Sequence, residues 1–560
     1  MKRTVLSVFI ATALFLSIFP ATASADTSRP AVWASNAVAY LEEYHLIPNE
    51  LFANYTAPIR RDEFTAVLMG IYNEACQNYN TFANEPNKFA DATSNRYETD
   101  IKKANIMGII NGTSDTTFNP DRNITREDTA TLIYRFIKLM FPQESAASVK
   151  VINDRDQIAG YALSSVEFCM NNGIMNGTGN DTFSPKGLLT RQEAMVLMYN
   201  ICMQYKIVEL GRESAIAELR PVYRGLHEMV YDGYMYVSVQ PYPFRFNDST
   251  YDSTVYTLFR TPLDQSQKNK GEILFTHEDE ISAYTVNPDN IFFCDRGPDR
   301  AVYSTDKDGK DLKLLYKLSR YTLSDFSYMY VQGDWLFVGA GSTLYKMRTN
   351  GTCLSILNSG VIGNSFQADG EYIYQQGGSP HGEFVLSRTS INGDITEVLY
   401  TNKNFCNSWA GGIFYKNKVY IAILEEGLDW VTGAPLIEIN VNTKEAIKNQ
   451  SLRIGTQNKH LVAGENGVYI SDITQDNITV DLNLPGLPDT LTRFTVIYKN
   501  ITGGSDIVVQ LKIEMGNGYT IKYGKYLYYT AVNGQRNTRC FYVYNIETGE
   551  FTDIFGNPVK

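Results

Sequence analysis

The sequence predicts a multidomain chain in which an all-α module of three repeats is followed by an all-β module. A helical pattern recurs every 65 residues in the first third, and alternating aromatic strands recur through the rest, the change falling near residue 220. A composition of 44% hydrophobic and 20% charged residues is typical of globular proteins. The 560 residues should therefore form more than one folded domain.

Residues 1–25 have the pattern of a secretory signal peptide. Lys2 and Arg3 precede an apolar run of about sixteen residues, and a small-residue cleavage site ends at Ala25. The alternative is an uncleaved membrane anchor, but the run is shorter than the roughly 20 residues that a spanning helix needs. No other stretch approaches that length, so we expect a secreted chain with no membrane span after cleavage.

Charge and cysteine content bear on the partners and sites to expect. Loss of Lys2 and Arg3 with the leader takes the formal net charge from −11 to −13, which argues against nucleic acid or an anionic membrane as a partner. The seven cysteines include no C-x-x-C pair, so neither a zinc site nor a disulfide framework is indicated. Their odd number leaves at least one free or intermolecular, and we expect most to be small buried hydrophobic residues.

The first third contains three copies of one helix–loop–helix unit, at residues 29–80, 87–142 and 150–205. In copies two and three, "GIINGTSDTTFNP" and "GIMNGTGNDTFSP" align without a gap. Gly108 and Gly173 follow amphipathic stretches, at the position of a glycine helix cap. Thr125 and Thr190 stand three residues before an acidic residue and so predict the start of a second helix.

Copy one is a degenerate version of this unit. It keeps an aromatic start at Trp33 and the sequence "RRDEF" before its second apolar stripe. His45 stands near the glycine position and Arg60 replaces the threonine, so Asp62 and Glu63 are expected to favour the helix start by their charge.

An arginine is predicted in the first turn of each second helix, at positions 61, 126 and 191. A cation there opposes the helix dipole and costs a few tenths to about 1 kcal/mol, so we expect its loss to leave stability nearly unchanged. A bound anion would explain it, because a carboxylate could collect backbone N–H donors and a bidentate guanidinium together. The alternative is an intramolecular salt bridge to Asp62, Asp128 or Glu193.

The copies resemble S-layer homology domains, whose signature runs from an aromatic–alanine pair through G-I-x-x-G and a T-F-x-P loop to I-T-R-x-E. Tyr97 and Tyr161 stand where the family commonly has tryptophan, and Asp128 replaces a glutamate. The resemblance implies three copies around a pseudo-threefold axis that bind secondary cell-wall polysaccharide, often through its pyruvate, in grooves between copies. It thus implies attachment to the bacterial cell wall or S-layer surface.

The repeats and the resemblance together predict an acidic-polysaccharide site. Its predicted residues are Arg61, Arg126, Arg191, Gly108, Gly112, Gly173, Gly177, Trp33, Tyr97 and Tyr161. The arginines would hold the acidic group, the glycines would allow close backbone approach, and the aromatic residues would flank the grooves.

After a connector at 206–224, residues 225–560 read as a β-propeller. Seven aromatic-rich strands recur, from "GYMYVSV" to "KYLYYTA", and most are followed by a second strand and a tight polar turn, with N-G or D-G dipeptides among the turns. Units of about 40 to 60 residues suit propeller blades, and we expect about six to eight, with seven favoured. The rhythm resembles the YWTD propellers of low-density-lipoprotein-receptor type.

No catalytic constellation, cofactor or metal site is expected in this region. The sequence "HEDE" at 277–280 lacks the second histidine of a zinc protease motif. Asp306, Asp308 and Asp311 could be read as calcium ligands, but their place in a hairpin favours a plain turn.

We therefore expect a non-catalytic surface protein that displays a propeller with an unknown ligand, either glycan or protein. The alternative is a wall-anchored polysaccharide-degrading enzyme, for which Glu425 and Glu426 near Trp430 are the candidates. Adjacent strand residues point to opposite faces, which argues against that pair.

Overall fold

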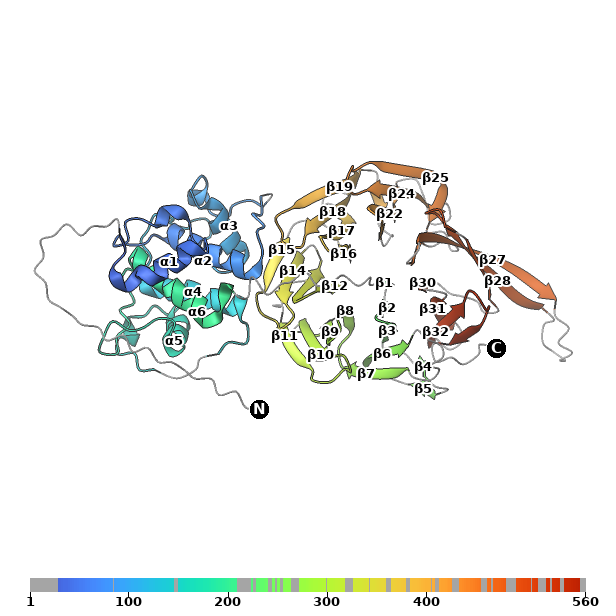
Figure 1. Cartoon of the computed structure of the whole chain (residues 1–560), viewed down its shortest axis with the longest axis horizontal. Helices are drawn as coiled ribbons and strands as arrows, with labels where there is room; N and C mark the ends of the chain where they lie inside the picture. Colours follow the sequence, from blue (N-terminus) through green and yellow to red (C-terminus); the bar gives the residue numbers. More distant parts are fainter. Residues whose placement is uncertain are drawn as a thin grey trace, which may run out of the picture.

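The computed structural model of the chain consists of a helical module and a ring of β-sheets (Figure 1). It describes residues 29–553 except for 84, 146–149, 209–222, 225–227, 240–243, 247–248, 252–254, 263–270, 299, 318–325, 342, 359–363, 379–382, 404, 408–411, 426–432, 455–460, 465–466, 480–489, 505, 512–519, 524–525 and 534–537. The predicted signal peptide, Glu426 and Trp430 lie outside the described residues.

The helical module has the predicted helix–loop–helix unit three times. Its main helices are α1 (Ser35–Glu43) and α2 (Arg61–Cys76) in copy one, α3 (Glu98–Ile106) and α4 (Arg126–Met140) in copy two, and α5 (Leu163–Asn171) and α6 (Arg191–Tyr205) in copy three. Short 3₁₀ turns accompany them: η1 (Val32–Ala34), η2 (Asn49–Leu51), η3 (Ala90–Ala92) and η4 (Arg155–Gln157).

The predicted helix signals have the expected conformations. Gly108 (φ 73°) and Gly173 (φ 69°) follow α3 and α5 in the left-handed region, and His45 takes the same conformation after α1 (φ 52°). The Thr125 hydroxyl accepts the Asp128 N–H, and Thr190 forms a full capping box with Glu193. Copy one therefore keeps the backbone path although it has lost the glycine.

Each long helix is also capped by a loop of another copy. The N–H of the first helical residue donates to a backbone carbonyl there, at 2.9 Å in all three cases: Arg61 to Arg122, Arg126 to Gly187, and Arg191 to Ala57. The second N–H does the same, since Asp62 donates to Pro120, Glu127 to Pro185 and Gln192 to Tyr55. Copy two thus caps copy one, copy three caps copy two, and copy one caps copy three, which closes a ring.

The β module begins with five sheets of four or five antiparallel strands. They are β1 (Tyr223–Arg224), β2 (Glu228–Tyr231), β3 (Tyr234–Val239), β6 (Tyr256–Pro262) and β7 (Glu272–His277); β8 (Ile281–Val286), β9 (Asn290–Asp295), β10 (Ala301–Asp306) and β11 (Lys313–Lys317); β12 (Phe326–Gln332), β13 (Trp335–Ala340), β14 (Thr343–Arg348) and β15 (Ser355–Asn358); β16 (Asn364–Ala368), β17 (Tyr372–Gly378), β18 (Phe384–Ser390) and β19 (Thr396–Asn402); and β21 (Ile413–Tyr415), β22 (Lys418–Ala422), β24 (Ala434–Asn440) and β25 (Ala446–Ile454).

The last sheet has eight strands in two antiparallel halves. These are β26 (Leu461–Gly464), β27 (Gly467–Thr479), β28 (Thr490–Asn500) and β29 (Ile507–Leu511), and then β30 (Thr520–Tyr523), β31 (Tyr526–Asn533), β32 (Thr538–Asn545) and β33 (Phe551–Asp553). A single parallel pairing of β26 with β30 joins the halves. Two small pairs, β4 (Phe244–Phe246) with β5 (Ser249–Tyr251) and β20 (Phe405–Asn407) with β23 (Leu424–Glu425), lie outside these sheets.

The sheets stand around a common centre in a propeller-like arrangement (Figure 1). The seven aromatic-rich segments form β3, β9, β13, β17, β22, β27 and β31, one in each sheet or half-sheet. Glycines with positive φ occupy the predicted turns, among them Gly309, Gly351 and Gly393. The turn at Gly309 is a plain hairpin, in which Asp306 accepts the backbone N–H groups of Asp308 and Lys310.

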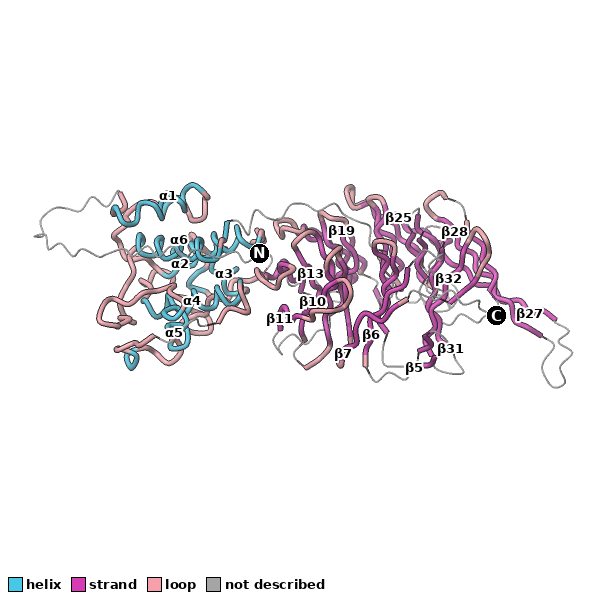
Figure 2. Tube along the Cα trace, turned by 60° about the horizontal axis from the view of Figure 1, so that its bottom comes forward, coloured by secondary structure: helices cyan, strands magenta, loops and turns pink. Residues whose placement is uncertain are grey.

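The helical module packs directly against the third and fourth sheets (Figure 2). Asn78 and Asn80, just after α2, donate side-chain hydrogen bonds to the carbonyls of Ile356 (2.9 Å) and Leu357 (2.7 Å). Trp335 and Leu357 belong to the same buried hydrophobic cluster as the helices. The two modules therefore share one core.

A buried lysine lies at this interface. Lys346 on β14 is 1% exposed, donates to the Gln77 carbonyl (2.8 Å), and has its ammonium 4.3 Å from the centre of a Trp335 ring. Burial lowers the pKa of Lys346 to about 7. The five cysteines whose side chains the structure describes, Cys76, Cys169, Cys202, Cys294 and Cys353, are buried and free, as predicted for small hydrophobic residues.

The lowered pKa of Lys346 predicts how the free energy of unfolding depends on pH. Because its pKa is lower in the folded chain, the unfolded chain binds more protons between pH 7 and about 10.5, so stability should rise with pH there by at most about 1.4 kcal/mol per pH unit. Lys346→Met keeps the apolar stem and removes this contribution, which makes the rise from pH 7 to 9 smaller. Urea denaturation at both pH values measures the difference. Equal rises in the two proteins would contradict a buried, titrating Lys346.

Candidate functional site

The three copies meet at three equivalent junctions, which we call grooves one, two and three after the arginine that each contains, Arg61, Arg126 and Arg191 respectively. In each groove, the arginine is the first residue of one copy's long helix. It faces a carboxylate on another copy, which is the third residue of that copy's long helix. The pairs are Arg61 with Asp128, Arg126 with Glu193, and Arg191 with Glu63. The grooves differ in how far the chain itself satisfies the arginine.

Arg61 is enclosed by the protein. It is 4% exposed, and its guanidinium donates to the carbonyls of Phe118 (3.1 Å) and Asn111 (3.4 Å) and lies 4.6 Å from the centre of the Phe118 ring. Burial lowers its pKa, although Asp128 stands 3.8 Å away. Arg61 therefore has a structural role between copies, as in the salt-bridge alternative, but its two carbonyl contacts were not predicted from the sequence.

The carboxylate in this groove is also occupied. Asp128 pairs with Arg122 and accepts a hydrogen bond from the hydroxyl of Tyr161 (2.7 Å). Burial, and then this hydrogen bond, raise the pKa of Tyr161. The Tyr161 side of the groove remains open to solvent, because the residue is 60% exposed.

Arg191 is neutralised by its facing carboxylate. Its guanidinium lies 2.5 Å from Glu63 Oε1 and also donates to the Ala53 carbonyl (3.0 Å). Tyr97, at the start of copy two, is 5% exposed and donates its hydroxyl to Glu50 (3.0 Å). This groove satisfies its own polar groups.

Arg126 is the exception among the three arginines. It donates to the carbonyls of Phe183 (2.8 Å) and Asn176 (2.7 Å), which fix the guanidinium, but it forms no ion pair within the described part of the chain. Gly187 lies beside it where Arg122 lies in the first groove, and a Cβ there would stand 3.2 Å from Arg126 Cδ. The half-buried arginine is thus held in place, and its guanidinium lies 4.8 Å from the centre of the Phe183 ring, but no side chain extends over it from position 187.

Trp33 is placed next to this groove. Its 3₁₀ turn η1 contacts α6, and the Ala31 N–H donates to the Gln192 side chain at the start of that helix (3.0 Å). Trp33 is 59% exposed. Groove two therefore combines an arginine that forms no ion pair in the described residues with an exposed indole.

The predicted use of backbone donors is wrong. The first two N–H groups of each long helix donate to carbonyls of another copy, and the third donates to Asp62, Thr125 or Thr190 side chains. No first-turn N–H is therefore left for a ligand carboxylate. Of the predicted salt-bridge partners, Asp128 lies 3.8 Å from Arg61, whereas Arg191 pairs with Glu63, which was not predicted.

The four glycines have structural reasons of their own. Gly108 and Gly173 end helices with positive φ. A Cβ on Gly112 would lie 2.2 Å from the Ser114 carbonyl oxygen, and one on Gly177 would lie 2.7 Å from that of Thr182. The loops themselves exclude side chains there, so a ligand is not needed to explain these residues.

Comparison with known proteins identifies the repeats. The sequence model of the S-layer homology domain matches residues 88–130 and 151–195, in copies two and three. The chain is similar to the exoglucanase XynX of Acetivibrio thermocellus, with 27% identity over 174 residues, which are 30% of this chain and 15% of that protein. It is also similar to an amylopullulanase of Thermoanaerobacterium thermosulfurigenes, with 27% identity over 173 residues, 30% of this chain and 9% of that one.

A cellulosome-anchoring protein of Acetivibrio thermocellus is 30% identical over 98 residues, 18% of this chain and 22% of that protein. In these three relatives the matched part is less than a quarter of the relative's own length. Among solved structures, a chain of a nidogen/laminin complex has 10% identity and a TM-score of 0.30, covering 53% of this chain and 89% of its own. A prolyl endopeptidase has 8% identity and a TM-score of 0.39, with 60% and 49% covered.

None of the described helices is long and apolar enough to cross a membrane. Attachment to the cell surface is indicated by the matched repeats, since S-layer homology domains bind cell-wall polysaccharide. Residues 88–130 and 151–195 are S-layer homology domains, and they place this chain on the bacterial cell surface, anchored to the wall.

Proposed function

We propose that this chain is a non-catalytic surface protein whose helical module binds an acidic secondary cell-wall polysaccharide and whose β module is displayed for binding glycan or protein. The observation that carries the proposal is Arg126, a half-buried, fixed guanidinium without an ion-pair partner in the described residues. A carboxylate on the polysaccharide, for example the pyruvate of a ketal, supplies a direct ion-pair partner.

Groove two is the principal binding groove in this proposal. The backbone carbonyls of Phe183 and Asn176 orient Arg126 before the ligand arrives, which reduces the entropy lost on binding. Trp33 offers an exposed aromatic face to the sugar. Groove three is silent, because an acidic ligand would have to displace Glu63 from Arg191.

The β module is proposed to be a seven-bladed propeller of the YWTD-like type. Support comes from its seven four- or five-stranded units, each with one aromatic-rich strand, and from contacts between the first strands of successive sheets, β8 with β12 and β12 with β16. The name of the cellulosome-anchoring relative is consistent with an anchor that carries another module.

Trp33→Ala gives the cleanest test of groove two. The residue is 59% exposed, so its loss should change the free energy of unfolding by no more than about 0.5 kcal/mol while weakening wall binding. Val32→Ala, at the neighbouring residue with 93% exposure, is the matched control and should bind normally. Cosedimentation with purified wall polysaccharide, alongside thermal unfolding, measures both effects. Equal binding by the two variants would remove Trp33 from the site.

Arg126→Ala should weaken binding by roughly ten- to a hundredfold, the loss of one charge-assisted contact of about 1.5 to 3 kcal/mol. Polysaccharide stripped of its acidic substituent should bind the parent and the variant alike, because the lost contact is to the carboxylate. Arg191→Ala should have a smaller effect on binding, since Arg191 already pairs with Glu63. Unaltered sedimentation of the triple variant at Arg61, Arg126 and Arg191 would reject the site.

Arg61→Ala should act on stability. It removes two hydrogen bonds and a ring contact between copies, so we expect a loss of about 2 kcal/mol in the free energy of unfolding. Arg96→Ala is the control: Arg96 is 66% exposed in its side chain and pairs with Glu50 at 2.7 Å, and such surface pairs contribute about 0 to 1 kcal/mol. Urea denaturation of both variants decides whether Arg61 is the structural member of the set.

Turnover would separate this proposal from the enzyme alternative. We expect the mature protein to bind without hydrolysing wall or plant glycans in a screen for released reducing ends. Hydrolysis that disappears when a carboxylate pair of the β module is changed would refute the non-catalytic proposal and leave the anchor intact.

A further inference from the structure

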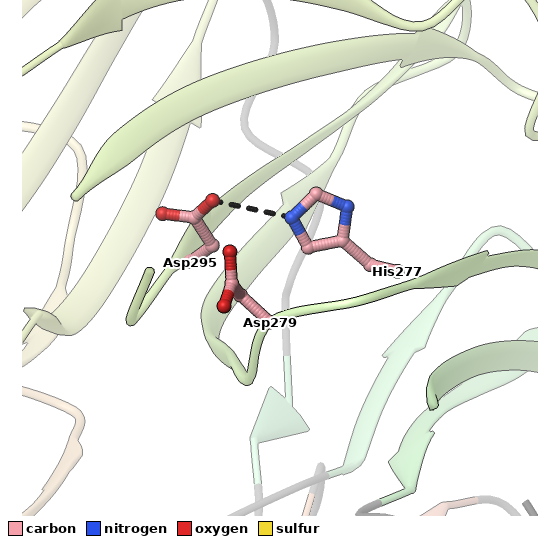
Figure 3. Close-up of side chains that lie close together, drawn as sticks. All are labelled: His277, Asp279 and Asp295. Atoms are coloured by element: carbon pink, nitrogen blue, oxygen red, sulfur yellow. Dashed lines mark hydrogen bonds and ion pairs between the residues drawn. The ribbon is translucent and has the colours of Figure 1, made fainter. Parts of the chain in front are cut away.

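Three metal-ligating side chains converge at the junction between the first two sheets of the β module. His277 ends β7, Asp279 lies in the turn to β8, and Asp295 ends β9 (Figure 3). His277 Nε2 lies 3.2 Å from Asp295 Oδ2. Each of the three residues has one potential ligand atom that lies within 4.8 Å of those of the other two.

Asp295 is held as a carboxylate in a buried place. Its side chain is 4% exposed, and it accepts hydrogen bonds from His277 and from the Ala301 N–H (2.8 Å). A buried carboxyl group with two hydrogen-bond donors thus forms the inner side of the cluster.

An ion pair between His277 and Asp295 explains only part of this arrangement. Asp279 is partly buried, its carboxylate stands next to that of Asp295, and in the described chain it has no hydrogen bond or ion pair. A Cβ on Gly297 would lie 2.3 Å from Asp279 Oδ2 and 3.4 Å from Asp295 Oδ2. The glycine leaves the space in which the two carboxylates converge, and the second carboxylate forms no ion pair with any described residue.

We propose that His277, Asp279 and Asp295 bind one divalent first-row transition-metal ion, Mn²⁺ or Zn²⁺. Ligands about 2.1 Å from such an ion are roughly 3.0 to 3.4 Å apart, which fits the His277–Asp295 separation. One imidazole with two carboxylates suits these ions, whereas Ca²⁺ takes six to eight oxygen ligands. The ion joins the last strand of the first sheet to the second sheet, independently of wall binding.

Metal titration of the full mature chain tests the proposal. After chelation and dialysis, isothermal titration with Mn²⁺, Zn²⁺ and Ca²⁺ in separate runs should give one Mn²⁺ or Zn²⁺ per chain and weaker Ca²⁺ binding. His277→Gln and Asp279→Asn should each lower the affinity for the metal ion. The loss should exceed the roughly 10- to 100-fold that is typical when a residue hydrogen-bonded to a metal ligand is changed. Labelling the histidines with ¹⁵N should change the hyperfine pattern of bound Mn²⁺.

Asp311→Asn is the matched control. Asp311 is an exposed acid in the nearby β10–β11 turn with φ 55°, a conformation that asparagine tolerates, and it should bind metal as the parent does. Asp279→Asn should fold normally, because the described chain gives its side chain no partner, and so it decides the case if His277→Gln unfolds. No Mn²⁺ or Zn²⁺ binding at millimolar concentration, or equal affinities in Asp279→Asn and Asp311→Asn, would overturn the proposal.

Discussion

The helical module depends on backbone hydrogen bonds that pass from one copy to the next. A helix that begins at a surface leaves its first N–H groups without partners, and here the loop of another copy supplies the carbonyls. Because copy one also caps copy three, the ring is closed and each copy needs the other two. The arginine side chains of copies one and two reinforce the same contacts through carbonyls of the neighbouring loops.

This closure explains why the grooves differ although the copies are repeats. Each groove is formed by two copies, one of which supplies the arginine and the other the loop beside it. A substitution in the loop of one copy therefore changes the groove that contains the arginine of another copy. Arg122 and Gly187 have equivalent positions, yet Arg122 pairs with Asp128 in the first groove, whereas Gly187 places no side chain beside Arg126. The sequence changes in copy one therefore affect more than one groove.

Local patterns made much of this fold predictable. The 65-residue spacing located the long helices, the capping threonines marked two of their first turns, and the aromatic segments located one strand in each β unit. The carbonyl caps and the Arg191–Glu63 pair were not predictable, because they depend on which copy lies beside which. Likewise "HEDE" contained His277 and Asp279, but Asp295 comes from another strand and only pairing of the sheets brings it near.

The contacts of Asn78, Asn80 and Lys346 have a mechanical consequence. They join the end of α2 to the β module by direct hydrogen bonds. Flow or an attached cell would exert a force on the β module. That force acts as shear on the packed core between the modules and is transmitted to the helical module, which is anchored to the wall. The load is then shared by many parallel contacts, and the module keeps a fixed orientation with respect to its anchor.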